Sequence, residues 1–571
     1  MWFVRFKLYF QPLIMNKLHG LKSITLIGGH LLFAILFFFS AWFWKERQAF
    51  DAAHYLLEII LRKSFFITHA RPLGVVSQVL PVIGVWFGLP LKWLMILYSV
   101  GDVLYYYFVF ILLILYFKNA RATLWFFIIY LSTLSYSFFC PVTELLQGLV
   151  LLPVAYCLFE NENRFSKMIV FALLPLLVFS HPLLFIPTGS LLVFYYINKG
   201  VLRESGGLII WFLVVLALKL FTLDQYDSQK TFYPMVYNDY GNIHNILDID
   251  YLLSFFKMLF TNYWILFFLF GYSCAQLISN KSYRALLVYL GCVLGFLSII
   301  ICTHHFEHIS NYSERMLLPL PCLVALPIGL IGANKNETNI QLFSFILLFG
   351  FFIFRLSLIF EAGHEFVLRN EQMKCIIDVS RLMGSQKVIA DENLLEQLPY
   401  ANTGWCYSIE SMLLSAVDGP QKVVSVAMQH EHIDRINELG SKLENNQWIK
   451  WTEFILPDDS LPKNYFSFQP QPYIPLLGDS ISATALKNIT IKTNNASMKV
   501  FHNEAYIDVY FESKSNLITI PKNTAIRIRY KGNESFFYLY SPISPNVPQQ
   551  IPLPSLDCEL NQLQLELIQT N

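Results

Sequence analysis

Residues 281–315 read KSYRALLVYLGCVLGFLSIIICTHHFEHISNYSER, and this segment is typical of a membrane-spanning helix with its flanking loops. Its central part, residues 285–302, contains no charged side chain and is long enough as a helix to cross the hydrocarbon core of a bilayer. Lys281 and Arg284 precede it, whereas the residues that follow carry little positive charge. Because Lys and Arg concentrate on the cytoplasmic side of membrane proteins, the stretch predicts a membrane helix that begins inside and ends outside.

The same alternation of charged loops runs along most of the chain. Every second loop is basic, and these loops contain Lys118/Arg121, Arg164/Lys167, Lys199/Arg203, Lys281/Arg284 and Lys335. The pattern predicts about eleven membrane helices, at 22–44, 93–117, 123–139, 145–159, 168–180, 183–198, 207–222, 260–279, 285–302, 316–333 and 339–360. Residues 74–88 are expected to form an external interfacial or re-entrant helix, because a further span there would invert every later loop.

Composition also indicates a polytopic membrane protein. The 571 residues are 55% hydrophobic and 14% charged, and the mean hydropathy of +0.47 is too apolar for a soluble globular protein. The net charge of +1 argues against nucleic acid as a partner. The basic N-terminal segment and the long first apolar run predict a retained helix with the N-terminus in the cytoplasm. Since no eukaryotic sorting signal is evident, we expect a bacterial inner (plasma) membrane and a periplasmic C-terminal region.

Composition changes along the chain predict three domains. Residues 1–362 form a transmembrane domain, 363–478 mix helical periodicity with short β-like runs, and 479–571 alternate like the strands of a β-sandwich. The expected fold is therefore a polytopic α-helical membrane protein with an external C-terminal region of α/β and β-sandwich type. Nine cysteines are scattered without a CxxC pair, so we expect buried thiols rather than a disulfide framework.

Two acidic residues are expected on the outer side. On a short helix, Asp51, His54 and Glu58 share one face, and an acid just above the membrane could deprotonate an acceptor hydroxyl or amine. A solvated carboxylate at a helix start is the alternative for Asp51. Glu144, in CPVTELLQG (140–148), offers a second acid at the same depth, or an ordinary helix-start carboxylate.

The densest polar cluster of the membrane region follows the span 285–302. His304 and His308 have a spacing that suits a metal pair, with interfacial packing of the rings as the alternative. Arg315 opens the next span on the side where positive residues are scarce. Its fork of donors suits a phosphate, although a snorkelling side chain or an ion pair with Glu314 would also explain it.

Three further residues are candidate substrate contacts. His181 lies at the outward turn SHP (180–182), where it either contacts substrate or caps the turn. Lys219, near the outer end of its span, either snorkels or meets a phosphate. Tyr240 belongs to the long external loop 223–258, which is rich in Asp and Tyr but matches no calcium-binding pattern.

Four of these features together resemble the GT-C superfamily of integral-membrane glycosyltransferases, among them the protein O-mannosyltransferases and the aminoarabinose transferases of lipid A. They are the first-loop acid Asp51, the helix-start acid Glu144, the long loop 223–258, and SERMLLPLPCL (313–323) at the start of a late span. The resemblance covers about residues 20–362. It implies transfer, with inversion, of a sugar from a polyprenyl-phosphate donor to a lipid, glycan or protein acceptor on the outer face.

The resemblance also implies roles for individual residues. Asp51 would be the general base, and Arg315 and Lys219 would hold the donor phosphate. Either Arg315 or a divalent cation at His304 and His308 would stabilise the leaving group, and no other cofactor is expected. Two other classes stay open. A polysaccharide polymerase or ligase would carry arginines in its large external loop, and a transporter of envelope glycans would show an internal repeat. Neither feature is found in the sequence.

Overall fold

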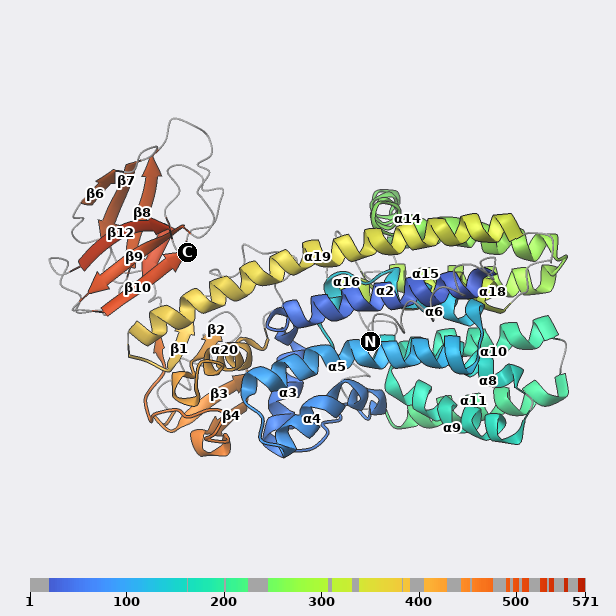
Figure 1. Ribbon diagram of the computed structural model, residues 1–571, viewed down its shortest axis with the longest axis horizontal. Coiled ribbons are helices and arrows are strands. Elements are labelled where there is room, and N and C mark those ends of the chain that lie inside the picture. Colours follow the sequence, from blue (N-terminus) through green and yellow to red (C-terminus); the bar gives the residue numbers. More distant parts are fainter. Residues whose placement is uncertain are drawn as a thin grey trace, which may run out of the picture. The chain divides into compact units, whose positions relative to one another are not determined.

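The computed structural model contains two compact units (Figure 1). The first unit consists of Met1–Arg47, Ser64–Gly84 and Ile96–Gly363, and the second of Gln48–Lys63, Val85–Met95 and His364–Asn571. The structure describes residues 20–161, 163–199, 202–223, 245–304, 306, 311–330, 338–382, 384–390, 405–428, 443–451 and 454–475, and beyond these only the strands that are named below. Residues 48–63 and 85–95 belong to the second unit, whereas the sequence analysis includes them in the transmembrane domain.

The first unit is built from helices. The elements that contribute to it are α2 (Gly20–Trp42), η2 (Pro72–Gln78), α4 (Val79–Trp86), α5 (Leu91–Ile111), the π-helical turn η3 (Leu112–Tyr116), α6 (Ala120–Leu131), η4 (Tyr136–Phe139), α7 (Glu144–Leu149), α8 (Leu152–Glu160), α9 (Arg164–Ser180), η5 (Pro182–Leu184), α10 (Phe185–Lys199), α11 (Leu202–Phe221), α14 (Ile249–Ser279), α15 (Tyr283–Thr303), α16 (Asn311–Leu317), α17 (Pro319–Val324), α18 (Leu326–Leu330) and the first part of α19 (Thr338–Leu382).

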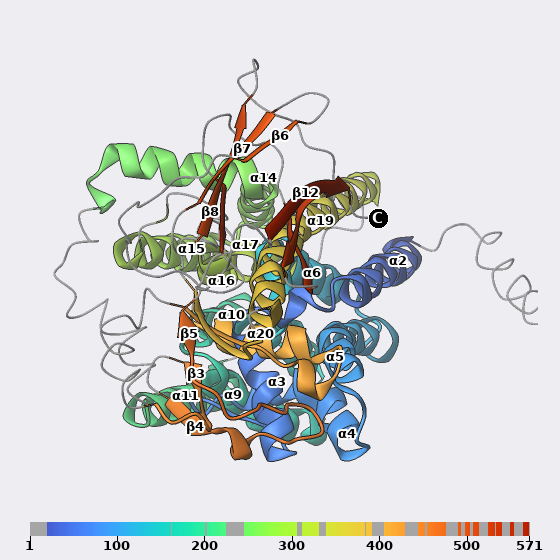
Figure 2. The ribbon, with the colours of Figure 1, turned by 90° about the vertical axis from the view of Figure 1, so that its left-hand side faces the viewer.

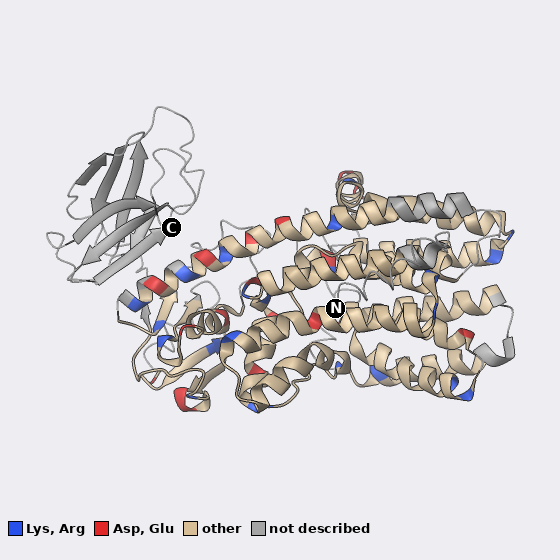
Figure 3. Ribbon diagram, viewed as in Figure 1, with Lys and Arg blue, Asp and Glu red and all other residues tan. Residues whose placement is uncertain are grey.

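Four helices among the described residues are long and apolar enough to cross a membrane. They cover Thr25–Trp42, Leu91–Tyr116, Ile249–Ser279 and Tyr283–Thr303. Figure 3, in which Lys and Arg are blue and Asp and Glu are red, shows few charged residues along these helices. A helix of this length and composition buries its own backbone hydrogen bonds and exposes apolar side chains to lipid. The protein is therefore a mainly helical, membrane-associated protein.

Side-chain caps fix the starts of several helices. The Asn119 side chain accepts a hydrogen bond from the Ala122 N–H at the start of α6, at 3.1 Å. Asp248 caps α14 in the same way through the Tyr251 N–H, at 3.0 Å. Each cap satisfies one of the backbone donors that a helix leaves unpaired at its N-terminus. The loop residues before these helices thus determine where each helix begins.

Two adjacent glycines allow α2 to pack closely against its neighbours. A Cβ atom at Gly29 would lie 2.5 Å from ring carbons of Phe110, and one at Gly28 would lie 2.6 Å from the Phe349 ring. Real Cβ atoms do not approach other atoms so closely, so a larger residue at either position would have to displace a phenylalanine ring. Small residues serve the same purpose in the helix interfaces of membrane proteins, because they let aromatic rings lie against the helix backbone.

The predicted span 316–333 is not one continuous helix. Its residues form the C-terminal end of α16 and the short helices α17 and α18. Prolines interrupt it, because a proline has no N–H to donate and its ring clashes with the preceding turn; they are Pro319, Pro321 and Pro327. The last carbonyls of α17 accept hydrogen bonds from neighbouring helices: Cys322 from Trp125 Nε1 (3.1 Å), and Val324 from Ser273 Oγ (3.0 Å) and the Tyr289 hydroxyl (3.0 Å).

The second unit contains a small parallel sheet with helices packed beside it (Figure 2). Its elements are α3 (Asp51–Arg62), the C-terminal part of α19, β1 (Lys387–Ala390), α20 (Tyr407–Ala416), β2 (Ser425–Met428), β3 (Gln447–Trp451), β4 (Phe454–Pro457) and β5 (Ile474–Pro475). The strand order is β2-β1-β5, and both pairings are parallel. Because α20 packs on β2 and also on α3, this layer fixes the position of α3 within the unit.

Two antiparallel sheets follow in the chain. One has the order β11-β8-β7-β6 and the other the order β10-β9-β12. Their strands are β6 (Ile489–Lys492), β7 (Ser497–His502), β8 (Tyr506–Glu512), β9 (Thr524–Tyr530), β10 (Asn533–Tyr538), β11 (Gln549–Pro552) and β12 (Leu563–Gln569). The strands β6 to β10 coincide with segments of alternating apolar and polar residues. Residues 513–523, between β8 and β9, lie outside the described residues.

Candidate functional site

Three basic side chains gather around His181 in the first unit. They are Arg71, which precedes η2, Lys219 in the last turn of α11, and Arg315 in α16. Burial, and then the charges of these three residues, hold the pKa of His181 well below its ordinary value. We call these four residues the basic cluster. Its members are far apart in sequence, and the fold brings them together.

A strained turn presents Arg71. His69 and Ala70, directly before it, have φ angles of 52° and 51°, in the left-handed region that side chains with a Cβ seldom adopt. Each such residue costs about 1–2 kcal/mol. The Arg71 N–H closes the turn by donating to the Thr68 carbonyl at 2.9 Å. Arg71 is therefore placed at the start of η2 by a turn with two strained residues.

Glu144 is the acidic partner of this arginine. It is the first residue of α7, and its Oε2 lies 3.7 Å from Arg71 Nη1. Both side chains are largely buried, with 8% and 12% of their surface exposed. Since a buried carboxylate is stable as an anion only beside a positive charge, Glu144 and Arg71 stabilise each other. Glu144, one of the two outward acids that the sequence predicts, therefore lies beside the basic cluster.

Arg315 is held in place by its neighbour in α16. Glu314 is fully buried and accepts hydrogen bonds from the backbone and hydroxyl groups of Ser135 and Ser137, while Arg355 lies 3.9 Å away. These contacts anchor α16 to the segment around η4. Cys140, at the end of that segment, accepts a hydrogen bond from Arg315 Nη2. Glu314 therefore pairs with Arg355 and serves to position Arg315.

His181 caps η5 and remains neutral. Its Nδ1 accepts a hydrogen bond from the Leu183 N–H at 3.1 Å. In a neutral imidazole whose Nδ1 is an acceptor, the proton lies on Nε2, which then donates. The cluster thus presents guanidinium, ammonium and imidazole N–H groups. A set of donors with a surplus of positive charge suits an anion, above all a phosphate.

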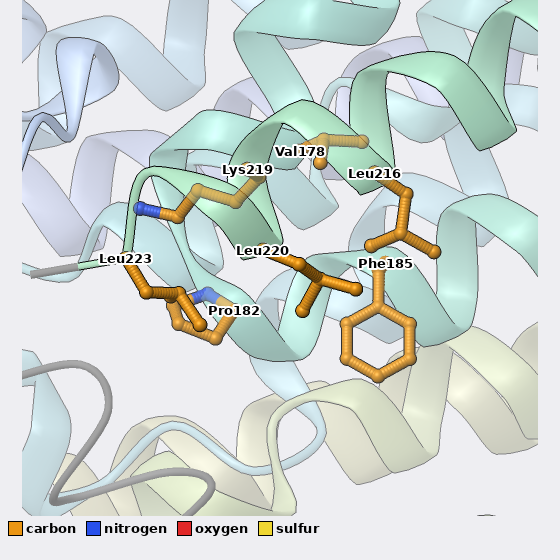
Figure 4. A pocket seen from close by; sticks show the side chains of 7 residues that line it. All are labelled: Val178, Pro182, Phe185, Leu216, Lys219, Leu220 and Leu223. Atoms are coloured by element: carbon orange, nitrogen blue, oxygen red, sulfur yellow. The ribbon is translucent and has the colours of Figure 1, made fainter.

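An apolar pocket adjoins Lys219 (Figure 4). It has a volume of about 210 Å³, open space included, and it is lined by Val178, Pro182, Phe185, Leu216, Lys219, Leu220 and Leu223. Figure 4 shows the Lys219 side chain extending toward Leu223 and Pro182, at the end of the pocket away from Phe185. Only about 10 Å³ of this volume is enclosed space, which is about enough for one water molecule. The pocket is therefore a shallow apolar hollow beside a charged side chain.

Asp51 and His54 lie in the second unit. Asp51 is the first residue of α3, and His54 and Glu58 follow on the same helix. Glu58 accepts hydrogen bonds from Lys450 Nζ and from Arg62 Nε, the latter at 2.6 Å. The ring of His54 packs edge-on against Trp451, with 4.7 Å between the ring centroids. Of the three residues predicted to share a face, His54 and Glu58 are therefore engaged in contacts within the unit, and Asp51 is half-buried.

The titration of His54 gives a testable pH dependence. Burial and then the charge of Lys450 lower its pKa from 6.5 to about 4, against opposing effects of Glu58 and Asp51. Between these two values the unfolded chain binds a proton that the folded chain does not, so stability falls as the pH is lowered from 6.5 to 4. The full effect of one such group is about 1.4 kcal/mol per pH unit.

We expect His54→Gln to reduce the slope of the unfolding free energy against pH, because the variant lacks the side chain that takes up this proton on unfolding. The slope should change by the equivalent of up to one bound proton. Thermal unfolding of both proteins across this pH range measures the difference. His364→Gln, which alters an exposed histidine of the same unit, is the control. Equal slopes for His54→Gln and the wild type would contradict the assignment.

Three predicted site residues remain, and the structure describes one of them, His304. His304 follows α15, and its Nδ1 lies 2.6 Å from Thr303 Oγ1, while its ring stacks on Phe306. Burial lowers its pKa to about 4, so it is neutral at physiological pH. His308 and Tyr240 lie outside the described residues. The part of the chain that the structure describes contains no group of three metal-ligating side chains, and the cation site stays a prediction.

Two residues with clear structural roles were not assigned from the sequence. Arg71 carries the same signal that singles out Arg315, namely a positive charge in a loop expected outside. Asp102, which lies within a predicted span, pairs with Arg47 at 2.8 Å. Arg47 also donates to the carbonyls of Phe138 and Ser99, the latter at 3.3 Å. The buried acid is thus explained as the counterion of a buried arginine.

Comparison of the chain with protein-family models, with curated proteins and with solved structures finds no match. The functional interpretation therefore rests on the arrangement of the residues themselves. That arrangement is a cationic donor cluster with one buried acid and an apolar pocket beside it.

Proposed function

We propose that this protein is an integral-membrane glycosyltransferase of the GT-C type, which transfers a sugar from a polyprenyl-phosphate donor to an acceptor on the outer face of the membrane. The observation that carries the proposal is the basic cluster next to the pocket at Lys219. A polyprenyl-phosphate sugar combines an anionic phosphate with an apolar chain. Few water-soluble substrates need both an array of cations and an apolar pocket.

The charges of the cluster match the chemistry of the leaving group. When the bond between the sugar and the phosphate breaks, negative charge grows on the phosphate while the sugar becomes oxocarbenium-like. Preorganised donors that face this growing charge stabilise the transition state more than the ground state. Arg71, Lys219 and Arg315 supply positive charge, and neutral His181 supplies a further N–H donor. Glu144, paired with Arg71, balances part of the charge in the absence of substrate.

The proposal includes an orientation in the membrane. We place the N-terminus in the cytoplasm, about eleven helices across the bilayer and the C-terminal region on the periplasmic side of a bacterial inner membrane, as the distribution of Lys and Arg indicates. Asp51 is proposed as the base that takes the proton from the acceptor. The role of Asp51 is inferred from its place in the first external loop.

Binding of a prenyl phosphate tests the proposal without requiring the acceptor. We expect Arg315→Ala to raise the dissociation constant for a radiolabelled prenyl phosphate about 10- to 100-fold. A hydrogen bond to a charged group contributes about 1.5–3 kcal/mol, and 1.4 kcal/mol corresponds to a factor of ten. Arg315→Lys should lose less, because it keeps the charge but not the planar fork of donors.

The matched control is Arg284→Ala, which removes an exposed arginine from a loop predicted to be cytoplasmic. Unchanged binding is expected for this variant. If Arg315→Ala binds the prenyl phosphate as tightly as the wild type does, the cluster is not the phosphate site. If the wild type binds it but transfers no sugar to any acceptor, the polymerase, ligase and transporter alternatives become the better explanations.

A further inference from the structure

The residue before Asp51 has an unusual backbone conformation. Phe50 precedes the first turn of α3 with φ 56° and ψ −128°. A side chain with a Cβ is strained at this positive φ, and such residues persist only where their surroundings hold them. Strain of this kind occurs preferentially at functional sites. Here it lies directly next to the residue that the proposed function makes the general base.

A buried ion pair of the second unit holds Phe50 in this conformation. The Phe50 N–H donates to Glu410 Oε1 at 2.7 Å. Glu410, in α20, accepts a hydrogen bond from Arg369 in α19, and the Arg369 guanidinium lies 4.9 Å from the centroid of the Phe50 ring. Arg369 and Glu410 are 2% exposed and Phe50 is 3% exposed. The Glu410 carboxylate thus holds the backbone of Phe50 by a hydrogen bond, and the Arg369 guanidinium makes a cation–π contact with its ring.

We propose that Glu410 and Arg369 are positioning residues for Asp51. The inference rests on the proposed function, in which Asp51 is the base. By holding Phe50 at its strained angles, the pair sets the direction in which α3 begins and therefore the direction in which its first residue projects. The first-turn bonds depend on the same residue, since the Ala53 and His54 N–H groups donate to the Phe50 carbonyl at 3.1 and 3.4 Å. A small misplacement of a reacting group is enough to slow a reaction severely.

Hydrogen exchange tests the structural half of this inference without any substrate. In the full-length protein in lipid nanodiscs, Glu410→Ala should speed exchange of the amides of residues 50–54 at least tenfold. Exchange in the second half of α3 should stay unchanged. Asp459→Asn, which alters an exposed acid of the same unit, is the control and should change neither. Unchanged exchange at residues 50–54 in Glu410→Ala would overturn the inference whether or not the protein transfers sugar.

Transfer kinetics test the functional half. Glu410→Ala should lower kcat about 10- to 100-fold and leave KM for the donor within twofold, and Glu410→Gln, which keeps an oxygen acceptor for the Phe50 N–H, should lose less. When Asp51→Asn is already present, Glu410→Ala should lower kcat no further, because Glu410 acts on kcat only through the Asp51 carboxylate, which the first substitution has removed. If the kcat losses of the two single variants multiply in the double variant, Glu410 acts independently of Asp51. A wild type without any transfer would refute the proposed function, and hydrogen exchange alone would then decide the positioning claim.

Substitution of Phe50 separates strain from loss of packing. Phe50→Ala and Phe50→Gly both remove the ring, but only glycine adopts the positive φ without strain. When combined with Glu410→Ala, Phe50→Gly should therefore restore slow exchange at residues 51–54 and part of kcat relative to Phe50→Ala. Equal behaviour of the two double variants would overturn the inference.

Discussion

Asp51→Asn should lower kcat for sugar transfer by about 10²–10⁴, the usual contribution of a positioned general base. Asparagine has nearly the same size as aspartate but does not accept a proton from the acceptor hydroxyl or amine. Because Asp51 is only half-buried at the start of α3, this near-isosteric change should leave the unit folded. Transfer of radiolabelled sugar from polyprenyl-phosphate donors by the purified protein in lipid measures the effect.

Two controls make the Asp51 result interpretable. Asp459→Asn removes an exposed carboxylate from the same unit and should retain full activity. Binding of a prenyl phosphate to Asp51→Asn should match the wild type, since the base acts on the acceptor. Equal transfer by Asp51→Asn and the wild type would remove Asp51 from the mechanism and leave Glu144 as the next acid to test.

Asp102→Ala should reduce the free energy of unfolding by about 3–5 kcal/mol, which is the usual cost of leaving one member of a buried ion pair alone. Arg47 is fully buried, and its Nη2 lies 2.8 Å from Asp102 Oδ2. Without the carboxylate, the guanidinium would keep its charge in an apolar surrounding with only carbonyls as acceptors. Titration with sodium dodecyl sulfate, followed by circular dichroism, measures the loss.

The double variant Arg47→Met/Asp102→Leu distinguishes a charge effect from a packing effect. Removing both charges should recover most of the stability, since apolar replacements of a buried ion pair are often neutral or stabilising. Lys463→Ala, at an exposed surface pair, should change stability by less than about 1 kcal/mol. A double variant as unstable as Asp102→Ala would show that the loss comes from packing.

The long apolar helices are the part of the fold that the sequence predicts best. The predicted spans 22–44 and 285–302 correspond closely to α2 and α15, because an uninterrupted apolar run has no other favourable structure in a membrane. The prediction fails where prolines or distant side chains control the backbone. The expected helix 123–139 ends at Leu131, and Ser135 and Ser137 beyond it donate to Glu314, far along the chain.

The candidate site was only partly predictable for the same reason. Loop charge places Arg315, Lys219 and His181 on one side of the membrane, and the structure brings them together. The pairing of Arg71 with Glu144 depends on tertiary contacts that no local pattern reveals. Asp51 and His54 belong to the second unit, which sequence spacing does not indicate.

The interrupted segment 316–333 has a consequence for how the chain assembles. Prolines divide it into short helices, and the carbonyls that end α17 accept hydrogen bonds from side chains of α6, α14 and α15. A segment whose helix-ending carbonyls are satisfied by its neighbours is less stable in lipid until those neighbours are present. Since Trp125 belongs to a helix nearly 200 residues earlier, the contact that completes this segment is of long range and forms late. This segment, which directly follows Arg315, should therefore be among the last parts of the chain to reach its final structure.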